Sequence, residues 1–141
     1  MAISIIETRW GEHEAALRSL RQKVFIEEQR VPEELEWDGE DNNAIHFLAL
    51  DADQQPAGCI RLLPTGQISR LCVLSEHRNN GVGSSLLVAA EEAARAKGME
   101  EIFLHAQTHA TSFYEAAGFS VTGGIFMDAN IPHRQMFKPL L

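Results

Sequence analysis

The segment RNNGVG at 78–83 restricts the fold of this chain more than any other feature, because it joins a predicted strand to the most regular predicted helix. The strand is expected at 67–74 and the helix at 81–97, with Gly98 standing where a left-handed helix cap is common. The apolar face of this helix consists of Val82, Leu86, Ala90, Ala93 and Ala94. A helix with one apolar face that follows a strand packs against a sheet, so an α/β fold is predicted.

Alternating and helical patterns of apolar residues place the other elements. Strands are expected at 3–8, 44–50, 57–63, 67–74, 102–106, 121–126 and 134–138, and further helices at 12–28 and 109–117. Turn residues separate the three strands between 44 and 74, which predicts an antiparallel meander. With 141 residues, 45% of them hydrophobic, the chain suits one core, and residues 1–141 are predicted to form a single domain.

Composition excludes several partners. Twelve basic and twenty acidic residues give a formal net charge of −8, whereas a duplex-binding surface needs clustered lysine and arginine, so no nucleic-acid partner is expected. No apolar run approaches the roughly 18 residues of a membrane span, and the N-terminal MAISIIETRW lacks a secretion signal. We therefore expect no membrane partner and a cytoplasmic protein. Cys59 and Cys72 have no metal-site spacing, so they are predicted to be free thiols, and no metal is expected.

The turn at 78–83 has the properties of an anion-binding site. The first N–H groups of a helix lack intrahelical partners, and the helix dipole adds about half a positive charge there. Gly81 and Gly83 let a phosphate approach the backbone, and Arg78 adds a forked cationic donor. Neither a P-loop nor a dinucleotide-binding fingerprint is present. By themselves the glycines are equally compatible with a helix start that holds no ligand.

Longer motifs resemble the GNAT acetyltransferase superfamily over nearly the whole chain. They are Leu71-Cys72-Val73, then HRNNGVGSSLL, then SFYEAAGF about thirty residues later. VFIEEQ near residue 24, AQTHATSFYEAAGF at 106–119 and Ile131-Pro132-His133 further resemble its ElaA-like (YjcF-like) branch. The resemblance implies an acetyl-CoA-dependent N-acetyltransferase. It also implies a mixed, mostly antiparallel sheet of about seven strands, flanked by about four helices and splayed between the fourth and fifth strands.

The resemblance also assigns roles to residues. It implies that the pyrophosphate of acetyl-CoA sits on the turn amides, that the pantetheine arm pairs with the fourth strand, and that Tyr114 protonates the departing thiolate. The implied cofactor-binding residues are Leu71, Cys72, Val73, Arg78, Asn79, Asn80, Gly81, Val82, Gly83 and Ser84. The Val73 N–H is our candidate donor to the thioester oxygen. From spacing alone, Phe113-Tyr114 is also compatible with core packing. Ser112 and Glu115 match a capping box.

The base that deprotonates the amine is not evident from the sequence. Many family members carry an acid where this chain aligns Ser69, and serine is no base unaided. The substitutes considered are His105, His109, Glu28, Asp128, His133 or a water relay. Each of these histidines is individually more typical of a structural hydrogen-bonding role. Cys72 is predicted to be a small buried residue rather than a nucleophile, and His46 to be structural.

An acidic segment at 27–41 holds eight acids and one arginine. Such a charge could attract a cationic amine acceptor, with Trp37 offering an aromatic face to the cation. A solvated loop explains the charge equally well. The leading hypothesis is acetyl transfer to a small-molecule or protein primary amine. The alternative is a non-catalytic acyl-CoA sensor, and a homodimer remains open.

Overall fold

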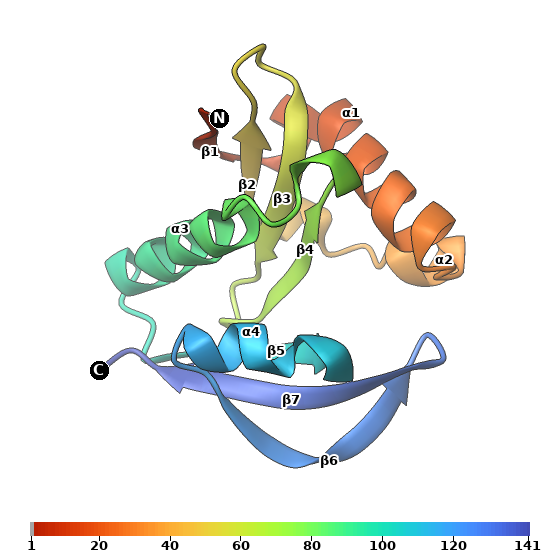
Figure 1. Cartoon of the computed structure of the whole chain (residues 1–141). Helices are drawn as coiled ribbons and strands as arrows, with labels where there is room; N and C mark the ends of the chain where they lie inside the picture. The colour runs from red at the N-terminus through yellow and green to blue at the C-terminus, as the bar shows by residue number, and fades with distance from the viewer. Residues whose placement is uncertain (1) are drawn as a thin grey trace.

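The computed structural model describes residues 2–141 (Figure 1). Its strands are β1 (Ser4–Thr8), β2 (Ile45–Leu50), β3 (Pro56–Leu62), β4 (Ile68–Val73), β5 (Glu101–Gln107), β6 (Ser120–Asp128) and β7 (Ile131–Pro139). Its α-helices are α1 (Trp10–Arg21), α2 (Glu33–Glu36), α3 (Val82–Ala96) and α4 (Thr111–Ala116). A π-helix, η1 (Gln22–Glu28), continues α1, and short 3₁₀ turns are η2 (Asp41–Asn43), η3 (Ser75–His77) and η4 (Thr108–Ala110). All the strands expected from the sequence are present.

The strands form two antiparallel sheets. Their orders are β1-β2-β3-β4 and β5-β7-β6, and in Figure 1 the second sheet lies below the first. The sheets meet at one parallel bridge between Gln67 and Phe103, where the Phe103 N–H donates to the Gly66 carbonyl at 3.2 Å. Beyond this bridge β4 and β5 are unpaired. The predicted sheet with a splay between its fourth and fifth strands is therefore confirmed, as two sheets joined at a single point.

A β-bulge in β4 accompanies the splay. Cys72 pairs with Cys59 and Ser69 pairs with Arg61, so Arg70 and Leu71 lie together opposite a single residue of β3. Arg70 has a positive φ of 55°, which is unusual for a side chain other than glycine. A bulge bends its strand and increases the local twist. This bend turns the carboxyl half of β4 away from β5 and leaves one edge of β4 open.

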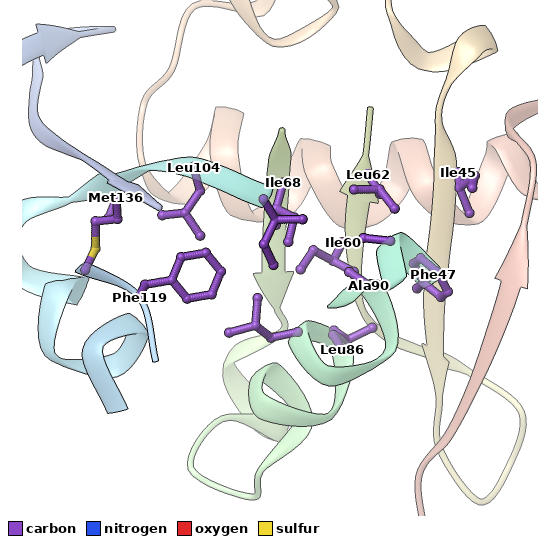
Figure 2. Close-up of a cluster of buried hydrophobic side chains, with 14 of the residues drawn as sticks. Ile45, Phe47, Ile60, Leu62, Ile68, Leu86, Ala90, Leu104, Phe119 and Met136 are labelled. Atoms are coloured by element: carbon purple, nitrogen blue, oxygen red, sulfur yellow. The ribbon is translucent and has the colours of Figure 1, made fainter. Parts of the chain in front are cut away.

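The core lies on both faces of the first sheet. On one face, Phe47, Ile60 and Leu62 pack against Leu86 and Ala90 of α3, as Figure 2 shows. The same cluster extends across β5 and β7 to residues at the start of β6. On the other face α1 packs its apolar side on Leu48 and the two cysteines. Because both faces are covered, β2 and β3 are almost continuously apolar.

The first helix differs from its prediction. It begins at Trp10 and changes to π-helical hydrogen bonding after Arg21. The Gln29 N–H then donates to the Val24 carbonyl at 3.0 Å and the Val31 N–H to the Phe25 carbonyl at 2.9 Å. Wider turns of this kind occur often at functional sites, and η1 forms one wall of the cleft described below.

The predicted capping box at Ser112 and Glu115 is wrong. Helix α4 begins one residue earlier, at Thr111, and no side-chain cap bond is present at its start. Ser112 and Glu115 are both exposed. The hydroxyl of Thr111 instead donates to the Thr108 carbonyl at 3.3 Å, because η4 leads directly into the helix.

Much of the acidic segment is neutralised inside the protein. Three arginines from α1, β3 and β4 bind three of its acids, and we call this set the arginine network: Arg21, Arg61 and Arg70 with Glu36, Asp38 and Asp41. The Asp41 carboxylate is shared by Arg21 at 2.6 Å and Arg61 at 3.0 Å. Burial would raise the pKa of Asp38, but its hydrogen bond and charge pairing with Arg61 lower it to about 2. Pairing with Arg21 and Arg61 likewise lowers the pKa of Asp41 against its burial, whereas burial raises the pKa of Glu36 despite its pairing with Arg70 and Arg21. These three acids are therefore partners of the fold rather than a free negative surface.

The expectation that Trp37 offers its ring to a ligand cation is wrong. The guanidinium carbons of Arg18 and Arg21 already lie 4.8 and 5.0 Å from its ring centroid. The same two arginines lie over Trp10. Trp37 therefore packs on Arg21 of the arginine network. It is not among the residues that line the cleft described below.

Among residues 2–141, no helix has both the length and the apolar character needed to cross a bilayer.

Candidate active site

A cleft of about 810 Å³ opens where β4 and β5 separate. Its walls are η1, the open edge of β4, the turn before α3, the face of β5, α4 and the tip of the β6–β7 hairpin. Nine of the ten predicted cofactor-binding residues line it; the exception is Asn80. Tyr114, Ser69 and all five substitute bases also line it. The fold thus gathers residues from 28 to 133 into one cavity.

The turn before α3 presents the backbone toward this cleft. Asn79 and Gly81 have φ values of 65° and 80°, and Gly81 is the residue that caps the helix. The first helical bond runs from the Ser85 N–H to the Gly81 carbonyl, so the amides of Val82 to Ser84 precede the bonded part of the helix. A Cβ at Gly83 would meet the side chains of Phe113 at 3.5 Å and Val73 at 3.9 Å, both ordinary contact distances. Gly81 is therefore required by its conformation, and Gly83 leaves the neighbouring amides uncovered by a side chain of its own.

The open edge of β4 exposes the backbone of Val73. The Leu74 N–H donates to the Ala57 carbonyl of β3 at 2.9 Å, and successive residues of a strand direct their amides to opposite edges. Val73 therefore faces the cleft. Its carbonyl already accepts a bond from Arg78 Nε at 2.9 Å on that side. This leaves the Val73 N–H as a cleft-facing donor, as its predicted role requires.

Arg78 lies at the predicted site but is engaged by a partner that the sequence did not suggest. Its two terminal nitrogens each donate to Glu28 of η1 at 2.7 Å. The hydrogen bond to Arg78 lowers the pKa of Glu28, which keeps its carboxylate ionised. A bidentate carboxylate has the geometry of a phosphate at the same guanidinium. A bound pyrophosphate would have to share or displace Glu28.

Replacing Glu28 with glutamine is expected to tighten acetyl-CoA binding by up to about fivefold. An exposed ion pair contributes only about 0.2–1 kcal/mol, so its removal frees Arg78 at little cost to the fold. Glu27→Gln is the matched control, because it removes the same charge from the neighbouring exposed position. Calorimetric titration should separate the two variants. Equal dissociation constants for both would contradict the competition between Glu28 and phosphate.

Tyr114 lies beside two other aromatic rings. Its ring makes edge contacts with Phe113 and Phe119 at centroid distances of 5.0 and 6.0 Å. Burial raises the pKa of its hydroxyl to about 12. The ring therefore packs against the core, as the alternative interpretation required, and at the same time the residue lines the cleft.

Ser69 and Cys72, which the sequence already disfavoured as a base and as a nucleophile, each contact another side chain. Ser69 Oγ accepts a hydrogen bond from Arg61 Nε at 3.0 Å and so belongs to the arginine network. The Cys72 thiol is buried 3.5 Å from the Cys59 sulfur. Its hydrogen bond with Cys59 and its burial raise the pKa of Cys72 well above the usual range, so it stays protonated. The prediction that Cys72 is a small buried residue is confirmed. His46 is likewise buried, with Nε2 3.0 Å from the Asp41 carbonyl oxygen.

The β5–β7 side of the cleft carries the histidines. His105 projects from β5 edge-on to Phe126, with ring centroids 5.2 Å apart, while His133 of β7 stacks on that ring at 5.8 Å. Burial lowers the pKa of His105, opposed by the nearby charge of Asp128. Sequence analysis did not single out Gln29 and Gln107, whose side chains join η1 to β5 through a 2.8 Å hydrogen bond.

A family model described as an acetyltransferase (GNAT) domain matches residues 11–140. The chain belongs to the GNAT acetyltransferase family. The uncharacterized N-acetyltransferase YjcF of Bacillus subtilis is 40% identical over 123 residues, covering 84% of this chain and 87% of the relative. Among solved structures, Escherichia coli ElaA has a TM-score of 0.86 at 26% identity, covering 96% of this chain and 99% of that one. An acyl-CoA N-acyltransferase from Pseudomonas aeruginosa has a TM-score of 0.86 at 28% identity, with coverage of 97% and 99%.

The residues of this GNAT chain fit an acyl-CoA. The strand edge at Val73, the helix-start amides and Gly83 all line the cleft, an arrangement that suits an extended chain that ends in a diphosphate. Within residues 2–141, no group of three or more histidine, cysteine or acidic side chains is arranged to hold a metal ion.

Proposed function

We propose that the protein transfers the acetyl group of acetyl-CoA to a primary amine by direct attack of the amine on the thioester. One observation carries this proposal. A single cleft brings an unpaired strand edge and a glycine-opened helix start together with the Tyr114 ring and His133. A site that only retained acyl-CoA would need the first two features and not the others.

Different residues of the cleft bind acetyl-CoA and stabilise the charge that develops during transfer. Acetyl-CoA, when bound, supplies an acetyl group activated as a thioester. The amides of the turn and Arg78 hold the diphosphate, and the edge of β4 pairs with the pantetheine. The Val73 N–H donates to the carbonyl oxygen as negative charge develops on it, an interaction whose loss typically lowers kcat by about 10²–10³-fold.

Tyr114 acts on the departing sulfur as a hydrogen-bond donor. Full proton transfer from a hydroxyl of pKa about 12 to a thiolate of parent pKa ~8.5 is uphill by about 5 kcal/mol. A hydrogen bond to the developing thiolate avoids that cost and still lowers the barrier. The high pKa also keeps the donor proton in place at every pH at which an amine acceptor is used.

We propose that the acceptor is cationic in its resting form. The negative charge that attracts it is assigned to Asp128 rather than to the acidic segment at 27–41. Asp128, at the end of β6, lines the cleft, and no ion pair within residues 2–141 involves it. The acidic segment contributes less unpaired negative charge than its composition suggests, because four of its acids are paired with arginines. These acids are Glu28, Glu36, Asp38 and Asp41. The apolar side chains of Phe25, Val31 and Leu35 line the same cleft and suit the body of an aliphatic or aromatic amine.

A panel of amines tests this function. Spermidine, 2-phenylethylamine, lysine methyl ester and hydroxylamine would each be incubated with acetyl-CoA, and release of CoA followed as a continuous rate. We expect sustained turnover with at least one cationic amine. Tight binding of acetyl-CoA without turnover on any amine would instead indicate a sensor of acyl-CoA.

A further inference from the structure

His133 is held in one orientation by its surroundings. Its side chain is buried, with the residue only 8% exposed, and it stacks on Phe126 with an interplanar angle of 25°. Its Nδ1 lies 2.7 Å from the carbonyl oxygen of Ile131 on the same strand. Stacking and the short hydrogen bond together fix the ring at the hairpin that closes the cleft.

This hydrogen bond determines which nitrogen carries the proton. A carbonyl oxygen can only accept, so Nδ1 must be the protonated nitrogen of the neutral ring. Nε2 is then a lone-pair acceptor. No protein group within residues 2–141 hydrogen-bonds to Nε2, although His133 lines the cleft. The ring thus presents one fixed, unprotonated nitrogen in a site that must accept a proton.

The other candidate bases lack this combination. Glu28 is bound to Arg78, and Ser69 accepts a bond from Arg61. His105 and His109 are exposed, and no hydrogen bond within residues 2–141 fixes either ring. Asp128 is exposed at the hairpin tip. The titratable or charged groups that line the cleft with His133 are Glu28, Glu36, Arg70, Cys72, His77, Arg78, His105, His109, Tyr114 and Asp128.

We propose that Nε2 of His133 is the general base of the acetyl transfer, an inference that rests on the proposed function. It accepts one proton from the acceptor ammonium, which becomes the neutral amine. The amine nitrogen then forms a bond to the carbonyl carbon while the carbon–sulfur bond breaks. The second proton leaving that nitrogen ends on the CoA thiolate. The imidazolium, whose Nδ1 proton stays on the Ile131 carbonyl, returns the Nε2 proton to solvent.

His133→Asn separates this role from a structural one. An asparagine amide can take the place of Nδ1 and keep the bond to the Ile131 carbonyl, but it has no counterpart of Nε2. We expect kcat/KM at pH 7.5 for the cationic amine 2-phenylethylamine to fall by about 10²–10⁴-fold, the range for a lost general base. Melting temperature and acetyl-CoA affinity should stay near wild-type values. His105→Asn is the matched control, with a loss of less than about fivefold.

Hydroxylamine gives the decisive contrast, because it is neutral at pH 7.5 and needs no deprotonation before attack. Its kcat/KM should fall less than about tenfold in His133→Asn, and raising the pH toward the amine pKa of ~10.4 should restore the rate with 2-phenylethylamine. An equal loss with both acceptors, or a larger loss in His105→Asn, would overturn the proposal.

Nitrogen NMR of histidine-labelled protein tests the tautomer without any turnover. At a pH at which the ring is neutral, the expected spectrum places its proton on Nδ1, and a neutral ring that carries its proton on Nε2 would rule out the base. A wild-type protein inactive with every amine would contradict the proposed function instead, because the tautomer would still be observed.

Discussion

Replacing Gly83 with valine is expected to weaken acetyl-CoA binding by at least about 100-fold while the protein stays folded. The valine side chain would fill the space above the helix-start amides and deny a diphosphate its backbone donors. Two lost hydrogen bonds to a charged group correspond to about 3–6 kcal/mol. The fold should tolerate the change, because a Cβ at this position makes only ordinary contacts with Phe113 and Val73. Gly81→Val is the poorer test, since its φ of 80° adds backbone strain.

Gly11→Val supplies a closely matched control. Gly11 is the second residue of α1 as Gly83 is the second residue of α3, and no atom would lie within 4 Å of its Cβ. Both variants carry a β-branched residue in a first helical turn. Acetyl-CoA should raise the melting temperature of wild type and Gly11→Val by several degrees through selective binding to the native state. If acetyl-CoA raised the melting temperature of Gly83→Val as much as that of wild type, the turn would not be part of the binding site.

Tyr114→Phe should lower kcat by roughly ten- to a thousandfold and leave the acetyl-CoA dissociation constant unchanged. Phenylalanine preserves the edge contacts with Phe113 and Phe119 and removes only the hydroxyl. Because burial raises the pKa of Tyr114 to about 12, its hydroxyl remains protonated up to about pH 11. Wild-type kcat should therefore show no alkaline decline caused by Tyr114 below that pH.

Single-turnover kinetics are the proper measurement for this variant, because slow product release would hide a change in the chemical step. An unchanged single-turnover rate would limit Tyr114 to packing. A decline of wild-type kcat near pH 10 that disappears in Tyr114→Phe would show that its hydroxyl is more acidic than its buried position implies.

The sequence predicted the features that depend on local pattern. The strands, helix α3 and the glycine turn follow from spacing of apolar residues and from backbone freedom, and each lies within a few residues of its expected place. The π-helical hydrogen bonds of η1 could not be predicted from the sequence, because its apolar residues continue the pattern of α1. The capping-box prediction was wrong because η4 leads directly into α4, so the helix begins from the preceding turn without a side-chain cap.

The errors in the site come from charges that meet across long stretches of sequence. Asp38 pairs with Arg61, 23 residues away, and Glu28 pairs with Arg78, 50 residues away. Counting acids between 27 and 41 could not reveal that arginines from α1, β3, β4 and the turn before α3 pair with half of them. The sequence did name His133 among several bases. Selecting it required the distance from Nδ1 to the Ile131 carbonyl, which depends on the local conformation of β7.

The most direct test of the central claim is the stoichiometry of products after many turnovers. Wild-type protein would be incubated with acetyl-CoA and 2-phenylethylamine, and both CoA and the acetylated amine quantified by mass spectrometry, with Gly83→Val in parallel. An acetyl transferase yields one acetylated amine for each CoA released, with the variant close to the uncatalysed background. CoA released without acetylated amine, or equal product from both proteins, would contradict an acetyl-transfer site in this cleft.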